Sequence, residues 1–335
     1  MKNMYDKINK IMWVIAFVLA LGLLFLLLNK ETWHEQTFHY FDTDIKVRIY
    51  HNKNMDAVFS KIDQIYKEYD HLTDAHKSYD GIVNIHTIRY NKEDKETLTL
   101  DNKLYEILSY VNEWNKKSQG IFKINQGATT DGWNMYLKEQ VGIPSDDVIQ
   151  KWKEQDRESL YLLGDSKIKN NHPMIELGKI PLGFANDAVT SYLKKEGIEH
   201  YLIQENGNAT AGLSVNQRPY KVALSILNKN NVSTITQIKN KTIVTYGATE
   251  DYYEYNDQLY SRFIDPNTSK PAKHVKQVTV IASKAREAYV VGNILYLTSV
   301  SEGEKIINNV PGVEAKWEDL DENITSSSKF YQYEV

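Results

Sequence analysis

The sequence predicts an α+β fold in which mixed or antiparallel sheets are covered by packed helices. Short runs of alternating apolar residues, typical of strands, are interspersed with a few longer runs of helical periodicity. The two patterns do not alternate as regular strand–helix pairs, which disfavours a doubly wound parallel sheet. No internal repeat is present. With 335 residues and 41% hydrophobic content, the chain can bury a substantial core in one large domain or two closely joined ones.

In the first half of the chain we expect strands followed by three helices. The strands lie in 37–50, around a polar turn at 42–44. The helices are a periodic one capped by Asn54 and ending near Leu72, a second from Asp101 to Gly120, and a short one over 145–155. The polar segment 90–101 is expected to be a loop or an edge strand.

The second half is expected to hold short strands and then two helices. The strands are expected at 201–203, 220–227, 242–246 and 277–282, and the helices at 285–297 and 302–309. The run 250–257 is expected to be a solvated hairpin. The polar tail 319–328 is expected to be poorly ordered.

Residues 11–28 form 18 consecutive uncharged, almost wholly apolar positions. As a helix they would span about 27 Å, at ~1.5 Å per residue, close to the ~30 Å hydrocarbon core of a bilayer. Lysines at 2, 7 and 10 place the N-terminus in the cytoplasm by the positive-inside rule. We therefore expect residues 1–30 to be a cytoplasmic N-terminus with a single-pass cell-membrane anchor, and 31–335 to be one extracytoplasmic domain. A cleaved signal peptide is the alternative, but the run is long and no small-x-small cleavage site follows it.

Composition excludes several classes of function. The net charge is −4 and the basic residues are scattered, whereas a nucleic-acid partner would need a clustered basic face. The chain has no cysteine, which excludes disulfides, thiolate catalysis, a lipoprotein anchor and Cys-ligated zinc.

The segment 174–187 is the most informative part of the chain. A short apolar strand (Met174, Ile175 and Leu177) is expected to run into Gly178 and Gly183 and then into an amphipathic helix. Such a strand–glycine–helix arrangement brings free backbone N–H groups together, which suits a phosphate. The alternative is that the turn only connects a strand to a helix.

Other motifs stand in order around this segment. They are Phe41-Asp-Thr43, Ser78-Tyr-Asp-Gly-Ile-Val-Asn84, Gly120-Ile-Phe-Lys123, Gln204-Glu-Asn-Gly207, Arg262-Phe-Ile-Asp-Pro266, Val278-Thr-Val-Ile-Ala282, Ala288-Tyr-Val-Val-Gly-Asn293 and Pro311-Gly-Val-Glu314. In this order and spacing the series resembles the FAD:protein FMN transferase family (ApbE) over about residues 36–318. The resemblance implies that family's fold, FAD as substrate, Mg²⁺ as cofactor, and a partner protein whose threonine receives FMN.

The resemblance also implies where the metal would be held, and the residues found there are unsuitable. The family's metal positions fall on Lys179, Tyr289 and Asn293. A phenol stays protonated near neutral pH, an asparagine offers only a neutral carbonyl, and an ammonium repels a divalent ion. We expect no normal Mg²⁺ site.

Two orientations of Lys179 are open from the sequence. Its ammonium could point into the cavity and pair directly with a diphosphate, taking the place of the metal. Alternatively it reaches solvent from the turn, as long charged side chains commonly do. We expect the solvent-facing orientation.

Catalytic and nucleotide-binding positions can be assigned through the same resemblance. The family's histidine falls on Arg262, which cannot act as a base at physiological pH but can hold a phosphate, and Asp265 follows it. The flavin-nucleotide contacts are expected at Thr43, Phe122, Lys123, Glu176, Lys179, Leu182 and Phe263. The alternative for Asp265, and for Asp187, is a structural role in a turn or helix cap.

These substitutions predict weakened or lost FMN transfer. A missing general base slows a reaction by roughly 10²–10⁴, and a missing metal by roughly another 10³. Three hypotheses remain: a transferase with an altered cation arrangement, a flavin- or nucleotide-binding pseudoenzyme serving an extracytoplasmic redox system, or an interaction module. Neither a zinc site at His71 and His76 nor self-flavinylation within 126–132 is expected.

Overall fold

We analysed a computed structural model of the chain. It describes residues 12–13, 15–19, 32–91, 96–215, 218–223 and 235–335. The predicted anchor over 11–28 falls largely outside these residues. Within the described residues, no helix combines the length and the apolar character needed to cross a bilayer.

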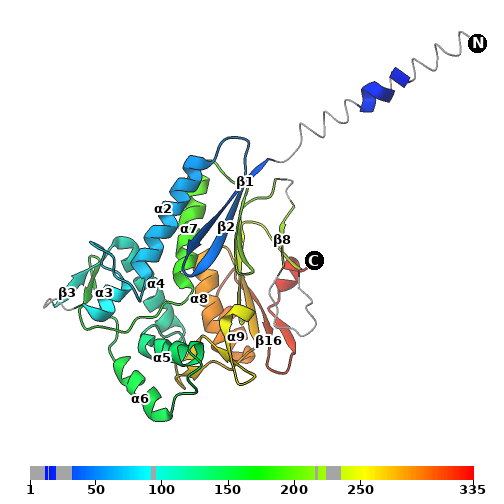
Figure 1. Cartoon of the computed structure of the whole chain (residues 1–335). Helices are drawn as coiled ribbons and strands as arrows, with labels where there is room; N and C mark the ends of the chain where they lie inside the picture. Colours follow the sequence, from blue (N-terminus) through cyan, green and yellow to red (C-terminus); the bar gives the residue numbers. More distant parts are fainter. Residues whose placement is uncertain (1–11, 14, 20–31, 92–95, 216–217, 224–234) are drawn as a thin grey trace, which may run out of the picture.

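The centre of the molecule is an eight-stranded antiparallel sheet with strand order β1-β2-β6-β7-β10-β15-β16-β17 (Figure 1). Its strands are β1 (Trp33–Tyr40), β2 (Thr43–Tyr50), β6 (Tyr201–Glu205), β7 (Asn208–Ala211), β10 (Lys241–Tyr246), β15 (Gln277–Ala282), β16 (Glu314–Glu318) and β17 (Ile324–Ser326). The tight β1–β2 turn has Phe41 and Asp42 in the left-handed region, at φ 55° and 54°. This turn directs Asp42 and Thr43 toward the site described below.

Three helices cover one face of the sheet and enclose the main core (Figure 1). They are α2 (Asp56–Thr73), α7 (Ile180–Lys195) and α8 (Ala285–Tyr296). Helix α7 packs between α2 and α8, while α8 lies on β10 and β15. Gly183 permits the close α7–α8 contact, because a Cβ there would lie 2.8 Å from the Tyr289 ring and 3.0 Å from the Ala285 carbonyl oxygen.

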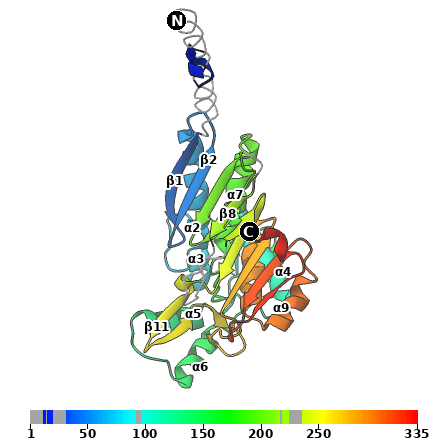
Figure 2. The same ribbon diagram turned by 90° about the vertical axis from the view of Figure 1, so that its right-hand side faces the viewer.

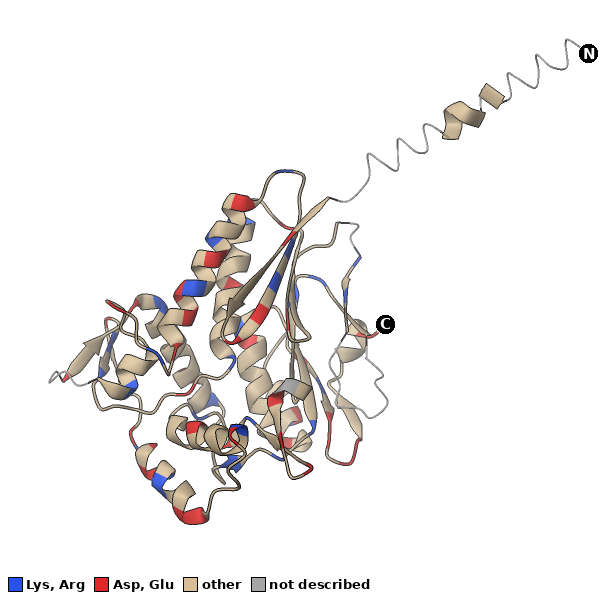
Figure 3. Ribbon diagram, in the orientation of Figure 1, with Lys and Arg blue, Asp and Glu red and all other residues tan. Residues whose placement is uncertain are grey.

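The opposite face is covered by a smaller cluster. It includes the short strands β8 (Tyr220–Ala223) and β9 (Ile235–Ile238), and Phe330 of the C-terminal 3₁₀ segment Phe330–Tyr333 is fully buried in it. Lys and Arg are interspersed with Asp and Glu over the elements seen in Figure 3.

The remaining elements surround the sheet and its three helices; among them, α5, α6 and β11 lie together at one end of the molecule in Figure 2. The helices are α3 (Ile85–Tyr90), α4 (Asn102–Lys117), α5 (Gly127–Lys138), α6 (Asp146–Gln155) and α9 (Val300–Ile307). The strands are β3 (Thr97–Thr99), β4 (Leu162–Gly164), β5 (Lys167–Lys169), β11 (Tyr252–Tyr255), β12 (Gln258–Ser261), β13 (Ile264–Asp265) and β14 (Lys270–Pro271). Trp133, Leu137, Ile149 and Ile264 join this part in a local core.

The predicted α+β class is confirmed, and most predicted elements are found near their expected positions. Helix α4 begins after Asp101, whose side chain accepts from the Lys103 backbone N–H at 2.7 Å. Two expectations were wrong. The segment 174–177 makes only an isolated bridge between Ile175 and Asn125, and the tail 319–328 contributes β17 to the sheet. The hairpin expected over 250–257 is found as the β11–β12 pair, although Asp251 at its start is buried.

Candidate functional site

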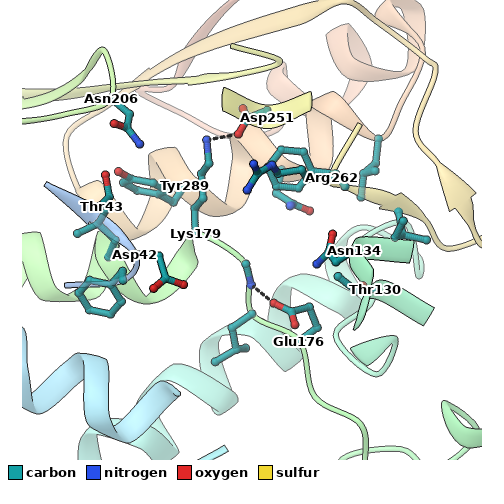
Figure 4. A pocket seen from close by; sticks show the side chains of 18 of the residues that line it. Asp42, Thr43, Thr130, Asn134, Glu176, Lys179, Asn206, Asp251, Arg262 and Tyr289 are labelled. Carbon is teal, nitrogen blue, oxygen red and sulfur yellow. Dashed lines mark hydrogen bonds and ion pairs between the residues drawn. The ribbon is translucent and has the colours of Figure 1, made fainter. Parts of the chain in front are cut away.

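A cavity of about 470 Å³ opens between the β1–β2 turn, the 176–182 segment, α5, α8 and the loop before β11 (Figure 4). The structure brings ten of the sequence-predicted positions to its wall. These are Thr43, Phe122, Lys123, Glu176, Lys179, Leu182, Arg262, Phe263, Tyr289 and Asn293. They come from five separate stretches of the chain, so the motif series describes one site.

The cavity wall contains an unusual number of unsatisfied polar atoms. Within the part of the chain that the structure describes, five buried side-chain atoms of lining residues have no hydrogen-bond partner: Thr43 Oγ1, Gln126 Oε1, Thr130 Oγ1, Lys179 Nζ and Glu205 Oε2. Buried polar groups are nearly always hydrogen-bonded in folded proteins. Gathered around one cavity, these atoms indicate a site for a polar ligand.

The 176–182 segment forms the floor of the cavity through local backbone geometry. Gly178 adopts φ +52°, a left-handed conformation that glycine accommodates readily. Its backbone N–H donates to Glu176 Oε1 at 2.8 Å, and Pro181 lies in the first turn of α7. The N-terminus of α7 therefore begins at the cavity, as the glycine motif predicted.

Lys179 points into the cavity, so the expected solvent-facing orientation was wrong. Its ammonium nitrogen is buried and forms an ion pair with Asp251, whose side chain is 1% exposed. The nitrogen also lies 5.5 Å from the ring centroid of Tyr246 and 5.7 Å from that of Phe263. The buried carboxylate and the two aromatic faces stabilise the Lys179 ammonium inside the cavity. The sequence pattern did not indicate any of these partners.

Glu205 is a fully buried carboxyl group in the cavity wall. It accepts hydrogen bonds from the Tyr289 hydroxyl and from Asn186 Nδ2 at 3.2 Å. Burial raises the pKa of Glu205 to about 7, and the two hydrogen bonds and the charge of Lys179 oppose this increase. The carboxyl group can therefore change its charge near neutral pH.

Arg89 on α3 orders the opposite wall and was missed by the sequence analysis. Its side chain is fully buried and donates to the Ile175 carbonyl oxygen at 2.7 Å, to Asp131 at 2.9 Å and to Glu176 at 3.1 Å. Burial raises the pKa of Asp131 although the Arg89 charge opposes the increase. Arg89 thus connects three segments and positions Glu176 at the cavity.

The two predicted catalytic positions are not equivalent in the structure. The guanidinium of Arg262 is at the cavity rim, 4.2 Å from the ring centroid of Tyr253, and can contact an anion. Asp265 does not line the cavity; it accepts from the Asn267 backbone N–H at 2.8 Å and contacts His274 at 3.1 Å. Its contacts fit the alternative role of a turn residue.

The residues present do not fit a divalent metal ion. The Tyr289 hydroxyl donates to Glu205, and burial raises its pKa well above its ordinary value, so the oxygen stays protonated. Lys179 brings a positive charge to the same wall, and Asn293 contributes a neutral amide. Across the described residues, no group of three or more His, Asp or Glu side chains is placed to hold a metal.

Asp187 caps a helix, which is the structural role given as its alternative in the sequence analysis. Its carboxylate accepts from the Ala285 backbone N–H at the start of α8 and from Arg286 Nε, both at 2.7 Å. Replacing Asp187 by alanine is expected to lower the free energy of unfolding by ~1–2 kcal/mol, since a helix cap is lost. Urea unfolding measures the change. Asp187→Asn, which keeps the acceptor, should lose less, and an equal loss in both variants would contradict the capping role.

Fold and cavity together define an α+β protein with one cavity suited to a polar ligand. The solved structure of the flavin transferase ApbE from Vibrio cholerae has a TM-score of 0.77 and 17% identity, with 90% of this chain and 99% of that chain covered. The ApbE protein of Thermotoga maritima has a TM-score of 0.77 and 17% identity, with 91% and 100% covered. At this identity the similarity shows the fold.

A model of the ApbE family matches residues 41–317, and the chain belongs to this family. The FAD:protein FMN transferase of Buchnera aphidicola is 31% identical over 214 residues, which is 60% of this chain and 62% of the relative. That of Escherichia coli K12 is 29% identical over 183 residues, or 51% and 52%. Each match therefore spans less than two-thirds of the relative's length. The resemblance seen in the motif series is confirmed.

Proposed function

We propose that this protein binds FAD in the cavity and that its FMN transfer is weakened or lost. The observation that carries the proposal is a set of five buried polar atoms without a hydrogen-bond partner among the described residues, one of them the ion-paired Lys179 ammonium. They surround the cavity of a protein whose family model is ApbE. The aromatic residues Phe122 and Phe263 line the same cavity and offer faces to a planar ring.

The reduced activity follows from the groups that occupy the predicted reactive positions. FMN transfer breaks the phosphoanhydride bond of FAD, forms a phosphoester with a threonine hydroxyl, and releases AMP. That threonine needs a base, and the departing phosphate needs its charge stabilised. Arg262 offers a guanidinium, which is not a base at physiological pH, and Lys179 and Tyr289 stand at the positions that the resemblance assigns to the family's metal ligands. Both requirements are left without the family's usual groups.

The test is incubation of the full-length chain with FAD and Mg²⁺, with thermal stability, released AMP and adduct formation on threonine-containing acceptor proteins measured together. The E. coli transferase serves as the active control. Stabilisation by FAD without AMP release supports the proposal. Absence of stabilisation overturns FAD binding and favours an interaction module, whereas AMP release at the control's rate overturns the loss of activity.

We also propose that residues 11–28 anchor the chain in the cell membrane, with the domain outside the cytoplasm near a flavin-accepting protein. The support is the length and apolar character of the run and the lysines before it. Protease treatment of intact cells followed by membrane fractionation tests the arrangement. A chain protected from protease, or recovered without the membrane, would contradict it.

A further inference from the structure

The environment of Lys179 indicates a built-in cation. Its ammonium nitrogen is buried, faces the cavity and has no hydrogen-bond partner among the described residues, although it is in ion-pair contact with Asp251. An ammonium group carries three N–H donors. One buried carboxylate contact leaves donors available for a ligand in the cavity.

Asp251 is arranged to position this cation. Its Oδ1 contacts the ammonium, and its Oδ2 accepts from the Gly247 backbone N–H at 3.0 Å. Because Asp251 is 1% exposed, its carboxylate has little freedom to move away with the lysine. The ring centroids of Tyr246 and Phe263 both lie within 6 Å of the nitrogen, and these rings limit where else the ammonium can move.

The surrounding carboxyl groups explain why a cation is needed at this place. Glu205 and Asp251 are both buried in the cavity wall, and a negative charge on either carboxyl group would repel the phosphates of a nucleotide. Lys179 offsets this repulsion, and it lies close enough to Glu205 to lower the pKa of that carboxyl group against the effect of burial. A covalently attached cation does so at any metal concentration.

We infer that Lys179 is the counter-ion for the diphosphate of a bound dinucleotide, and that this cavity binds such a ligand without a divalent metal. The inference rests on the proposed FAD binding and adds the group that recognises the phosphates. The ammonium donates to phosphate oxygens as a charge-assisted hydrogen bond, in the place where the donor set excludes Mg²⁺. No bond is made or broken in this step.

The test compares FAD with riboflavin, which has the ring and no phosphate. Dissociation constants are measured by fluorescence titration of the full-length chain, once with excess Mg²⁺ and once with EDTA. For the wild type, the FAD constant is expected to agree within about twofold between the two conditions. Lys179→Met should weaken FAD binding by roughly 10- to 100-fold and leave riboflavin binding unchanged.

Two further variants keep the result interpretable. Lys179→Met leaves the buried Asp251 carboxylate without its ion-pair partner, which can prevent folding. The double variant Lys179→Met/Asp251→Asn removes both charges together, so it tests FAD binding even if the single variant does not fold. It should show the same loss of FAD affinity. Lys103→Met, which removes an exposed ion pair with Glu68, is the matched control and should bind FAD like the wild type.

The outcomes separate the inference from the proposed function. If the wild type does not bind FAD in either condition, the proposed function fails. If the wild type binds FAD only with Mg²⁺, or if the double variant binds FAD normally, the inference fails while the proposed function stands. Loss of both FAD and riboflavin binding in the double variant would also overturn it, because the role would then not be specific to phosphate.

Discussion

Replacement of Arg89 by methionine is expected to lower the free energy of unfolding by ~3–5 kcal/mol. The change removes the guanidinium that Asp131 and Glu176 share and leaves both carboxylates, 28% and 22% exposed, without it. It also frees the Ile175 carbonyl oxygen that Arg89 Nε binds at 2.7 Å. Urea denaturation followed by circular dichroism measures the loss, and FAD affinity should fall with it because Glu176 is no longer held.

Arg157→Met provides the comparison. Arg157 is 70% exposed and contacts Glu154 at 3.6 Å, so its removal should change stability by no more than about 0.5 kcal/mol. A loss below about 1 kcal/mol for Arg89→Met, similar to that of the control, would show that the buried network does not stabilise the site.

The second large effect is a pH-dependent difference between Glu205→Gln and the wild type. Burial raises the pKa of Glu205 from 4.5 to about 7 in the folded protein, so the folded state holds a proton that the unfolded state has already released. The contribution of Glu205 to stability therefore falls as the pH rises from 4.5 through 7, and the full loss is reached above pH 7. The difference between the two pKa values corresponds to a loss of ~3 kcal/mol in the free energy of unfolding.

Glutamine copies the neutral carboxyl group at every pH. The variant should match the wild type near pH 5 and exceed its free energy of unfolding by up to ~3 kcal/mol near pH 8. Urea unfolding across this range gives the difference curve. The exposed Glu113→Gln on α4 should give a flat curve. A flat curve for Glu205→Gln as well would mean that its carboxyl group is not held neutral.

The sequence predicted the parts of this molecule that depend on neighbouring residues. The cap at Asp101 and the periodic helices α2 and α4 depend on residues within one or two turns of chain, and the structure has them as predicted. The polar turn predicted at 42–44 is found one residue earlier, at Phe41 and Asp42. The order of motifs also predicted which positions share one cavity. The family resemblance, not periodicity, carried that information.

The features that the sequence did not predict depend on contacts between distant segments of the chain. Arg89 appears as one charge in a short apolar helix, and its three partners lie 42 to 87 residues further along. Asp251 stands in an acidic, tyrosine-rich run whose sequence is typical of a solvated hairpin. In the structure it forms an ion pair with Lys179, which lies 72 positions earlier in the chain. The orientation of a long side chain is decided by such partners, and these are visible only after the chain has folded.

The cavity wall is drawn from stretches between Phe41 and Leu297, which includes most of the chain. No fragment that lacks part of residues 41–297 can assemble the whole wall, and closing the wall requires pairings across long loops, which form slowly. Ligand binding should therefore appear late in refolding, together with the last native contacts, and a proteolytic product cut within residues 41–297 should bind no ligand. For a protein of this family, a flavin signal in refolding would report the completed molecule and no earlier species.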